Sequence, residues 1–390
     1  MYELLFQDPE IRELFDASHQ GADGAQPRAL AQAVLAYGEH IERPQVLAEM
    51  IERIAHRHVS LGIEARHYPV VGAAILEALR DLLGEHPDGE VAISAWKEAY
   101  GLLSSVFIDR ERELQSLSAA QVGGWQGWRT FKVADIVQES CDVRSFILVP
   151  ENGAAVPDYV PGQYVSVTLE PMRSTPLVRS YSLSDTPRPD RLRISVKREV
   201  HGVVSRRLHD DIGLGAQIAV RPPVGNFTLS ADWRPIVLLS GGIGLTPMMS
   251  MLETLVSQKT SRQVLWAHAT RDGSHHSFKD RVRALAENGQ VNVVTWYEHP
   301  KLGDVKGVDF DPAGFVSRDA LARAAPWLAD AHVYICGPKP FMRAMREALI
   351  YQNVPPSQLH AEVFGPDDLG WLAPSAVASE ARLPAVPSGN

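Results

Sequence analysis

The sequence predicts a multidomain protein in which an all-α domain precedes a small antiparallel β-barrel and an α/β domain with a parallel sheet. Apolar residues first recur at three- and four-residue steps, as in helices. Short alternating runs broken by Pro and Gly follow, and then strand-like runs alternate with helical stretches. We place the domains at 1–117, 124–230 and 231–366, and expect residues 367–390, rich in Ala, Pro and Ser, to form a disordered tail.

Charge and cysteine content exclude several classes of protein. A net charge of -9 argues against a nucleic-acid partner. Cys141 and Cys336 stand outside any CxxC pair, which argues against a disulfide framework or zinc site and favours a reducing compartment. No apolar run reaches the roughly 20 residues of a membrane span, and the acidic first residues do not resemble a signal peptide. We expect a soluble, cytoplasmic monomer.

One histidine in the helical domain is a candidate metal ligand. An apolar stripe along 47–54 continues one turn later to His58, which therefore faces the helical core. Such a histidine can ligate a metal through one ring nitrogen. Tyr68 follows nearby, and Glu111 continues the face of Tyr100 and Phe107 on a later helix, so both can take the free N–H of the imidazole. The alternatives are an ordinary core histidine and an interhelical pair.

The middle of the chain carries a pattern suited to a flavin. Predicted strands cover five ranges: 131–137, 144–149, 164–169, 193–197 and 217–220. In RSYSLS, Arg179, Tyr181 and Ser182 offer a cation for phosphate, an aromatic ring and a small hydroxyl. The later HGVVS segment predicts a glycine turn and a helix start at Ser205 that favours pyrophosphate. An ordinary strand with a surface arginine is the alternative.

The last third contains a glycine turn between a strand and a helix. Strands are predicted at 236–240, 264–269, 291–297 and 332–337. Gly241, Gly242 and Gly244 let the backbone approach a phosphate, and we expect Thr246 to cap the helix and Pro247 to suit its first turn. After the second strand, Arg271 favours the 2′-phosphate of NADPH and Asp272 the ribose hydroxyls of NADH, so both coenzymes stay open.

The helical segments IERIAHRHVS, IEARHY and AWKEAYGLLSSVFIDRE, with GGWQGW after them, resemble the globin half of bacterial flavohaemoglobins. The resemblance implies that His58 is the proximal ligand of haem b and that Tyr68 and Glu111 support it. It further implies that Tyr2 hydrogen-bonds bound oxygen, that Phe15 packs on the haem, and that two distal-helix residues lie over the iron: Gln26 and Leu30.

The order PGQY, RxYS, GxxS and PxGxF resembles a flavin domain of the ferredoxin-reductase type, and GGxGxTP with CGPKPFM resembles its nucleotide domain. The resemblance implies that two short segments bind FAD, with these residues: Arg179, Ser180, Tyr181, Ser182, Gly202, Val203, Val204 and Ser205. It places Cys336, Gly337 and Pro338 beside the nicotinamide. It also implies a terminal strand at 360–366, with Phe364 over the flavin face and Glu362 near the flavin and the haem edge.

The resemblance covers the chain from Met1 to about Pro366 and implies a nitric oxide dioxygenase. Electrons would pass from NADH or NADPH to FAD and then to haem, and nitric oxide would be oxidised to nitrate with O2. The family's globin begins with another helix and most of a second before the position of Tyr2, so the expectation is either a misassigned start codon or a shortened globin domain. Two alternatives remain: a flavin reductase whose globin lacks haem, and a haem-based oxygen or redox sensor.

Overall fold

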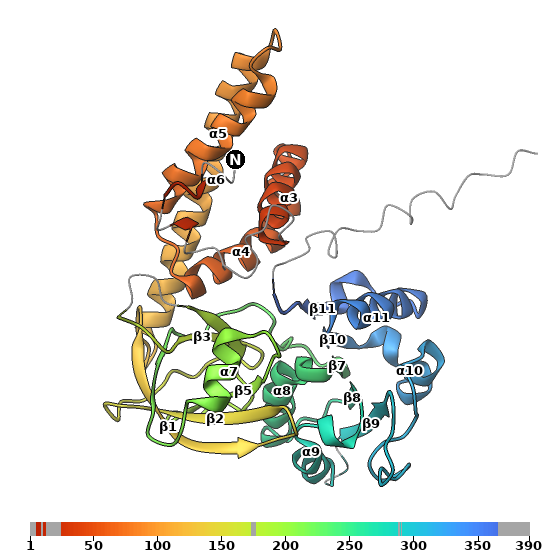
Figure 1. Ribbon diagram of the computed structural model, residues 1–390. Helices are drawn as coiled ribbons and strands as arrows, with labels where there is room; N and C mark the ends of the chain where they lie inside the picture. Colours follow the sequence, from red (N-terminus) through yellow and green to blue (C-terminus); the bar gives the residue numbers. More distant parts are fainter. Residues whose placement is uncertain are drawn as a thin grey trace, which may run out of the picture.

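The computed structural model describes residues 5–8, 11–12, 25–172, 177–287, 289 and 291–365, and of residues 25–32 and 44 it describes the backbone alone. The chain forms a helical part, a β-barrel and an α/β part in sequence order, with the barrel between the other two (Figure 1). This is the predicted fold class. None of the helices formed by the described residues is both long and apolar enough to cross a membrane. The predicted tail lies outside the described residues.

The helical part is built around the long helix α6. Its elements are α3 (Ala25–His40), the 3-10 turn η2 (Pro44–Leu47), α4 (Ala48–Leu61), α5 (His67–Leu83) and α6 (Gly89–Ala120). Helix α6 packs against both α4 and α5 and continues three residues beyond Leu117. Helix α4 ends at Gly62, whose left-handed φ of 82° suits a residue without a Cβ.

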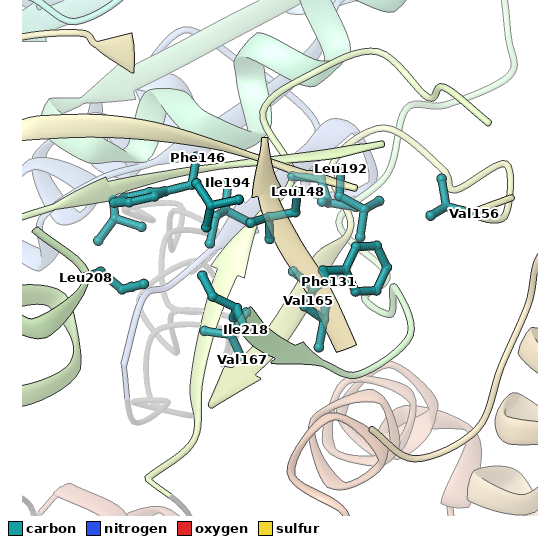
Figure 2. Packing of buried hydrophobic residues seen from close by; sticks show 14 of the residues in the cluster. Phe131, Phe146, Leu148, Val156, Val165, Val167, Leu192, Ile194, Leu208 and Ile218 are labelled. Carbon is teal, nitrogen blue, oxygen red and sulfur yellow. The ribbon is translucent and has the colours of Figure 1, made fainter. Parts of the chain in front are cut away.

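The barrel follows as an antiparallel sheet. Its elements are β1 (Arg129–Gln138), β2 (Val143–Pro150), β3 (Tyr164–Thr168), β4 (Arg179–Ser182), β5 (Leu192–Lys197), α7 (Val203–Asp210) and β6 (Gln217–Val220). The strand order is β4-β3-β6-β1-β2-β5, and an antiparallel bridge between Leu183 and Ile194 brings the two edges together. Alternate side chains such as Phe131, Phe146 and Val165 fill the interior (Figure 2).

The α/β part has a parallel sheet in the order β11-β10-β7-β8-β9. Its strands are β7 (Ile236–Gly241), β8 (Val264–Thr270), β9 (Val291–Tyr297), β10 (His332–Cys336) and β11 (Leu359–Glu362). Its helices are α8 (Leu245–Ser257), α9 (Lys279–Ala286), α10 (Arg318–Ala324) and α11 (Lys339–Tyr351), with 3-10 turns η3 (Gly242–Gly244), η4 (Gly273–His275), η5 (Leu328–Asp330) and η6 (Pro356–Gln358). Helices α8 and α9 cover one face of the sheet and α10 and α11 the other, which explains why β7 and β10 are buried throughout.

A buried carboxylate joins the barrel to the α/β part. Glu253 of α8 accepts hydrogen bonds from Arg193 of β5 at 3.2 Å and from the backbone N–H of Thr186 at 3.1 Å. Arg281 of α9 adds a third bond at 3.0 Å. The barrel and the α/β part are therefore fixed to each other by polar groups that are satisfied within the interface.

Candidate functional site

The imidazole of His58 is held by side chains from two other helices. Its Nδ1 lies 2.7 Å from Oε1 of Glu111 on α6 and 2.9 Å from the hydroxyl of Tyr68 on α5. The Tyr68 hydroxyl also donates to the same Glu111 oxygen. The side chain of Glu111 is only 5% exposed, so this carboxylate interacts with the protein rather than with water. The three residues that the sequence singled out are therefore brought together.

These contacts determine which ring nitrogen is left for a metal. A carboxylate only accepts hydrogen bonds, so Nδ1 carries a proton and Nε2 is the nitrogen available as a ligand. Burial, together with the charge of Glu111, raises the pKa of Tyr68, which keeps this hydroxyl protonated as a donor. Within the described part of the chain no hydrogen bond to Nε2 is found. An imidazole whose Nδ1–H is held by a carboxylate suits the proximal position of a haem, so this group fits the site.

Aromatic packing fixes the orientation of the same ring. The ring of Phe107 lies 5.7 Å from that of His58 and stacks 6.3 Å from that of Tyr68. The hydroxyl of Tyr100 donates to the backbone carbonyl of Tyr68 at 2.7 Å. The side chains that face His58 are thus themselves positioned by packing and hydrogen bonds.

Four predicted haem-pocket residues cannot be placed in the same way. Tyr2 and Phe15 lie outside the described residues. Gln26 and Leu30 lie on α3, but their side chains are outside the described part. Their roles stay predictions.

The predicted flavin motif forms strand β4. Its alternation places Arg179 and Tyr181 on one face and Ser180 and Ser182 on the other. Tyr181 packs against the barrel core, and burial raises the pKa of its phenol. The Ser180 hydroxyl lies 3.0 Å from that of Ser166 on β3, which supports the strand from its neighbour.

The second flavin segment begins helix α7. Gly202 precedes the helix in an extended conformation, and no side chain caps the helix start. The Ser205 hydroxyl accepts from the backbone N–H of Glu199 at 3.3 Å, and a Cβ at Gly202 would lie 2.3 Å from that hydroxyl. A side chain at position 202 would therefore displace the Ser205 hydroxyl from this bond. The first N–H groups of α7, at Val203 and Val204, suit a pyrophosphate.

Two turns at the carboxyl end of the parallel sheet pack backbone against backbone. A Cβ at Gly244 would lie 2.3 Å from the carbonyl oxygen of Cys336, and one at Gly337 would lie 3.0 Å from the backbone nitrogen of Gly241. Gly242 has a φ of +53° and nothing within 4 Å of its Cβ position. Gly244 and Gly337 thus allow the close approach of the turns, and Gly242 leaves open space for a phosphate.

The expected cap at Thr246 is wrong. Helix α8 begins at Leu245 directly after η3, so Thr246 lies inside the first turn. Its hydroxyl donates to the carbonyl of Ile243 at 3.1 Å instead of accepting from the helix N–H groups. Pro247 occupies the first turn, as the sequence indicated.

The turn that contains Gly337 follows β10, which lies beside β11. Cys336 is fully buried and pairs with Glu362 across the two parallel strands. Burial, and next the charge of Glu362, raises the pKa of the thiol, which keeps it neutral. Pro338 precedes α11, and Phe364 is 41% exposed just beyond β11. An exposed aromatic ring lies close in sequence to the strand pair that borders the predicted nicotinamide position.

In the loop after β8, the two candidate coenzyme ligands differ in exposure. Asp272 is buried, and its carboxylate accepts bonds from Ser274, from His275 at 2.9 Å and from Lys301 at 2.8 Å. Burial opposes ionisation, but these bonds, that of Lys301 foremost, lower the pKa of Asp272. Arg271 is exposed. Asp272 therefore stabilises its own loop, and Arg271 is the charged group that faces solvent.

One polar contact between distant segments was not predicted. His56, two residues before His58, accepts a hydrogen bond from the backbone N–H of Gly225 at 3.0 Å. The sequence shows a histidine and the barrel motif PxGxF, but no local pattern relates two positions 169 residues apart.

Comparison with known proteins finds a different family model in each of the three parts of the chain. A globin family model matches residues 1–107, an oxidoreductase FAD-binding domain matches residues 130–229, and an oxidoreductase NAD-binding domain matches residues 238–347. A flavohemoprotein of Bordetella pertussis is 48% identical over 93% of this chain and 91% of its own length. One from Rhizobium meliloti is 40% identical over 94% of this chain and 92% of its own length.

Solved structures agree with these matches. The flavohemoglobin of Malassezia yamatoensis, determined with bound FAD and haem, has a TM-score of 0.77 at 28% identity and covers 93% of this chain and 92% of its own. The FAD/NAD-binding domain of the nitric oxide dioxygenase from Vibrio cholerae has a TM-score of 0.56 at 34% identity and covers 61% of this chain and 99% of its own.

A histidine-bearing globin followed by FAD- and NAD-binding domains defines an oxidoreductase in which a haem protein is fused to its own reductase. The chain belongs to the flavohaemoprotein family. Its cofactors are haem, FAD and a nicotinamide dinucleotide, as expected from the sequence.

Proposed function

We propose that this protein is an NAD(P)H-dependent nitric oxide dioxygenase that oxidises nitric oxide to nitrate with O2. The observation that carries the proposal is the carboxylate-held imidazole of His58 in a chain whose remaining domains form a flavin reductase. The Vibrio cholerae relative described as a nitric oxide dioxygenase supports the same reaction. When bound, FAD accepts a hydride from the coenzyme and passes electrons singly to haem, which binds oxygen.

On the globin side, His58 provides the iron ligand through Nε2. Glu111 accepts a hydrogen bond from Nδ1–H and so makes the imidazole a stronger electron donor, and Tyr68 donates a hydrogen bond to the same carboxylate. Further roles are proposed for the residues outside the described side chains, with distal hydrogen bonds from Tyr2 or Gln26 and packing by Phe15 and Leu30.

On the reductase side, the strand β4 residues Arg179 to Ser182 bind the flavin and its phosphates, and the start of α7, residues 202–205, receives the pyrophosphate. The turn at Gly242 receives the coenzyme phosphates. Cys336, Gly337 and Pro338 border the nicotinamide. Glu362 and Phe364 complete the flavin environment.

The coenzyme choice follows from the loop after β8. Since Asp272 is occupied by Ser274, His275 and Lys301, it does not offer a carboxylate to ribose hydroxyls. The exposed Arg271 is suited to the 2′-phosphate of NADPH. We infer that the enzyme accepts NADPH as well as NADH.

A single chain that carries all three cofactor domains supports action as a monomer. The need for NAD(P)H as electron donor supports a cytoplasmic location. Size-exclusion chromatography with light scattering measures the oligomeric state directly.

The reaction is tested by mixing purified protein with NAD(P)H, O2 and nitric oxide. We expect rapid consumption of nitric oxide with nitrate as product, together with a haem absorption band in the resting protein. Rapid coenzyme oxidation with flavin bands alone would instead identify a haem-free flavin reductase. A haem band with only slow turnover would favour a sensor.

A further inference from the structure

The helix that carries His58 is fastened to the flavin barrel by its neighbour His56. Helix α4 contacts β3 of the barrel, and Figure 1 shows its end lying against that domain. His56 is 8% exposed, and its Nδ1 accepts the backbone N–H of Gly225 at 3.0 Å. A buried amide that lost this acceptor would have to be desolvated without compensation. The bond therefore defines how α4 sits on the barrel.

Gly225 is in turn joined to the flavin strand. The preceding residue, Val224, exchanges two backbone hydrogen bonds with Tyr164, each of 2.9 Å. Tyr164 begins β3 and pairs with Ser182, the last residue of β4. The ring of His56 is thus connected to the RSYS strand through a short series of backbone hydrogen bonds in the barrel.

On its other side, His56 is linked through Glu52 to α6, the helix whose Glu111 contacts His58. Because Nδ1 accepts an amide proton, Nε2 carries the ring proton and donates to Glu52 at 3.1 Å. Arg110 of α6 binds Glu52 with two bonds of 2.7 and 2.6 Å. The next residue on α6, Glu111, is the partner of His58. Adjacent residues of α6 thus orient the iron ligand and the contact with the barrel.

A second contact lies beyond His58 at the end of α4. The guanidinium of Arg221, just after β6, packs on Gly62, where a Cβ would lie 2.2 Å from its Nη2. The same group stacks over the ring of Trp128 at 4.4 Å. Its charge also faces the carbonyl end of α4, which is the favourable end for a cation. The barrel therefore contacts α4 on both sides of His58.

We propose that His56 is a positioning residue that fixes the haem-ligand helix relative to the flavin strand and thereby sets the rate of electron transfer from FAD to haem. The inference rests on the proposed electron relay, but not on nitric oxide as the substrate. Each electron that the reduced flavin loses is gained by the haem iron. Because such transfer depends steeply on separation, a shift of α4 by about 1 Å is expected to slow it markedly.

Two conservative substitutions separate the bonds of His56. In His56→Asn the amide oxygen takes the place of Nδ1, so the bond to Gly225 is kept and the bond to Glu52 is lost. In His56→Gln the amide group takes the place of Nε2, so the bond to Glu52 is kept and the bond to Gly225 is lost. Both variants remain polar, which limits the effect on folding.

The test combines a structural readout with a kinetic one on the full chain. Amide hydrogen exchange at Gly225 reports the bond directly, and anaerobic stopped-flow absorbance separates flavin reduction by NAD(P)H from haem reduction by flavin. We expect His56→Gln to expose the Gly225 amide and to slow haem reduction roughly tenfold, with flavin reduction and haem content unchanged. His56→Asn should retain protection and rate.

Two outcomes would overturn the proposal. One is haem reduction at the wild-type rate in His56→Gln despite an exposed Gly225 amide. The other is an equal loss in both variants, which would indicate a general structural role. Since neither readout uses nitric oxide, a failure of the dioxygenase proposal leaves this test intact.

Discussion

The globin and the nucleotide domain of this protein build their sites from different parts of the chain. Around His58 the site consists of side chains from three helices that meet through hydrogen bonds at one carboxylate. At the carboxyl end of the parallel sheet it consists of backbone, because Gly244 and Gly337 allow two turns to touch. In the first site chemical identity determines function, and in the second the absence of a side chain does.

The difference predicts different responses to substitution. Replacing a side chain of the His58 cluster changes the electronic properties of a ligand while the helices remain packed. Adding a methyl group to a glycine of the turns changes backbone positions while every polar group remains present. The following predictions use this contrast.

The largest effect is expected from His58→Ala. Loss of the only candidate iron ligand in the described cluster should abolish haem binding, while NAD(P)H still reduces the flavin at the wild-type rate. Absorption spectra of the purified variant measure both. His86→Ala, which replaces an exposed histidine of the same domain, is the matched control and should keep its haem. Wild-type haem content in His58→Ala would remove His58 from the site.

A smaller effect is expected from Glu111→Gln. A neutral amide still accepts from Nδ1 but no longer strengthens the imidazole, so haem affinity or turnover should fall by about 10- to 100-fold. Tyr68→Phe should lower haem affinity or turnover less than Glu111→Gln does, because Glu111 retains its charge. Haem transfer to a scavenger protein measures the affinity. Glu98→Gln, at an exposed position of the same helix, should have no effect. If Glu98→Gln lowered haem affinity as much as Glu111→Gln, the carboxylate of Glu111 would have no special role.

In the nucleotide domain, Gly244→Ala should raise the KM for the coenzyme by about tenfold, because the new Cβ would displace the Cys336 turn at a cost of about 1–3 kcal/mol. Haem and FAD content should not change. Gly213→Ala, where nothing lies within 4 Å of the Cβ position, is the control. Unaltered coenzyme kinetics in Gly244→Ala would show that the contact between the turns does not shape the coenzyme site.

The smallest effect is expected from Arg271→Ala. Loss of an exposed cation should raise the KM for NADPH several-fold and leave that for NADH unchanged, since only NADPH carries the 2′-phosphate. The two coenzymes serve as controls for each other in steady-state assays. Equal changes for both would assign Arg271 a role other than 2′-phosphate recognition.

Much of the fold could be predicted because its signals are local. Residues 217–220 and 291–297 alternate or run apolar over the same lengths that β6 and β9 have in the structure. The helical spacing that places Glu111 on the face of Phe107 also made it a candidate partner of His58, and the structure shows this contact. In each case the period of the element decides which side chains meet.

Other features depend on long-range contacts and could not be predicted. The occupation of Asp272 by Lys301 depends on how two loops of the α/β part fold onto each other. The bond between His56 and Gly225 depends on how one domain docks on another. At Thr246 the local cap signal was overridden, because η3 continues directly into α8 and moves the helix start.

The central claim is that His58 holds a haem that the flavin reduces. The most direct measurement is the absorption spectrum of the full chain, expressed with a haem supply, before and after anaerobic addition of NAD(P)H. We expect haem and flavin bands together, and loss of the flavin band followed by conversion of the haem band to its reduced form. A yellow protein without a haem band, or a haem that stays oxidised while the flavin bleaches, would contradict it.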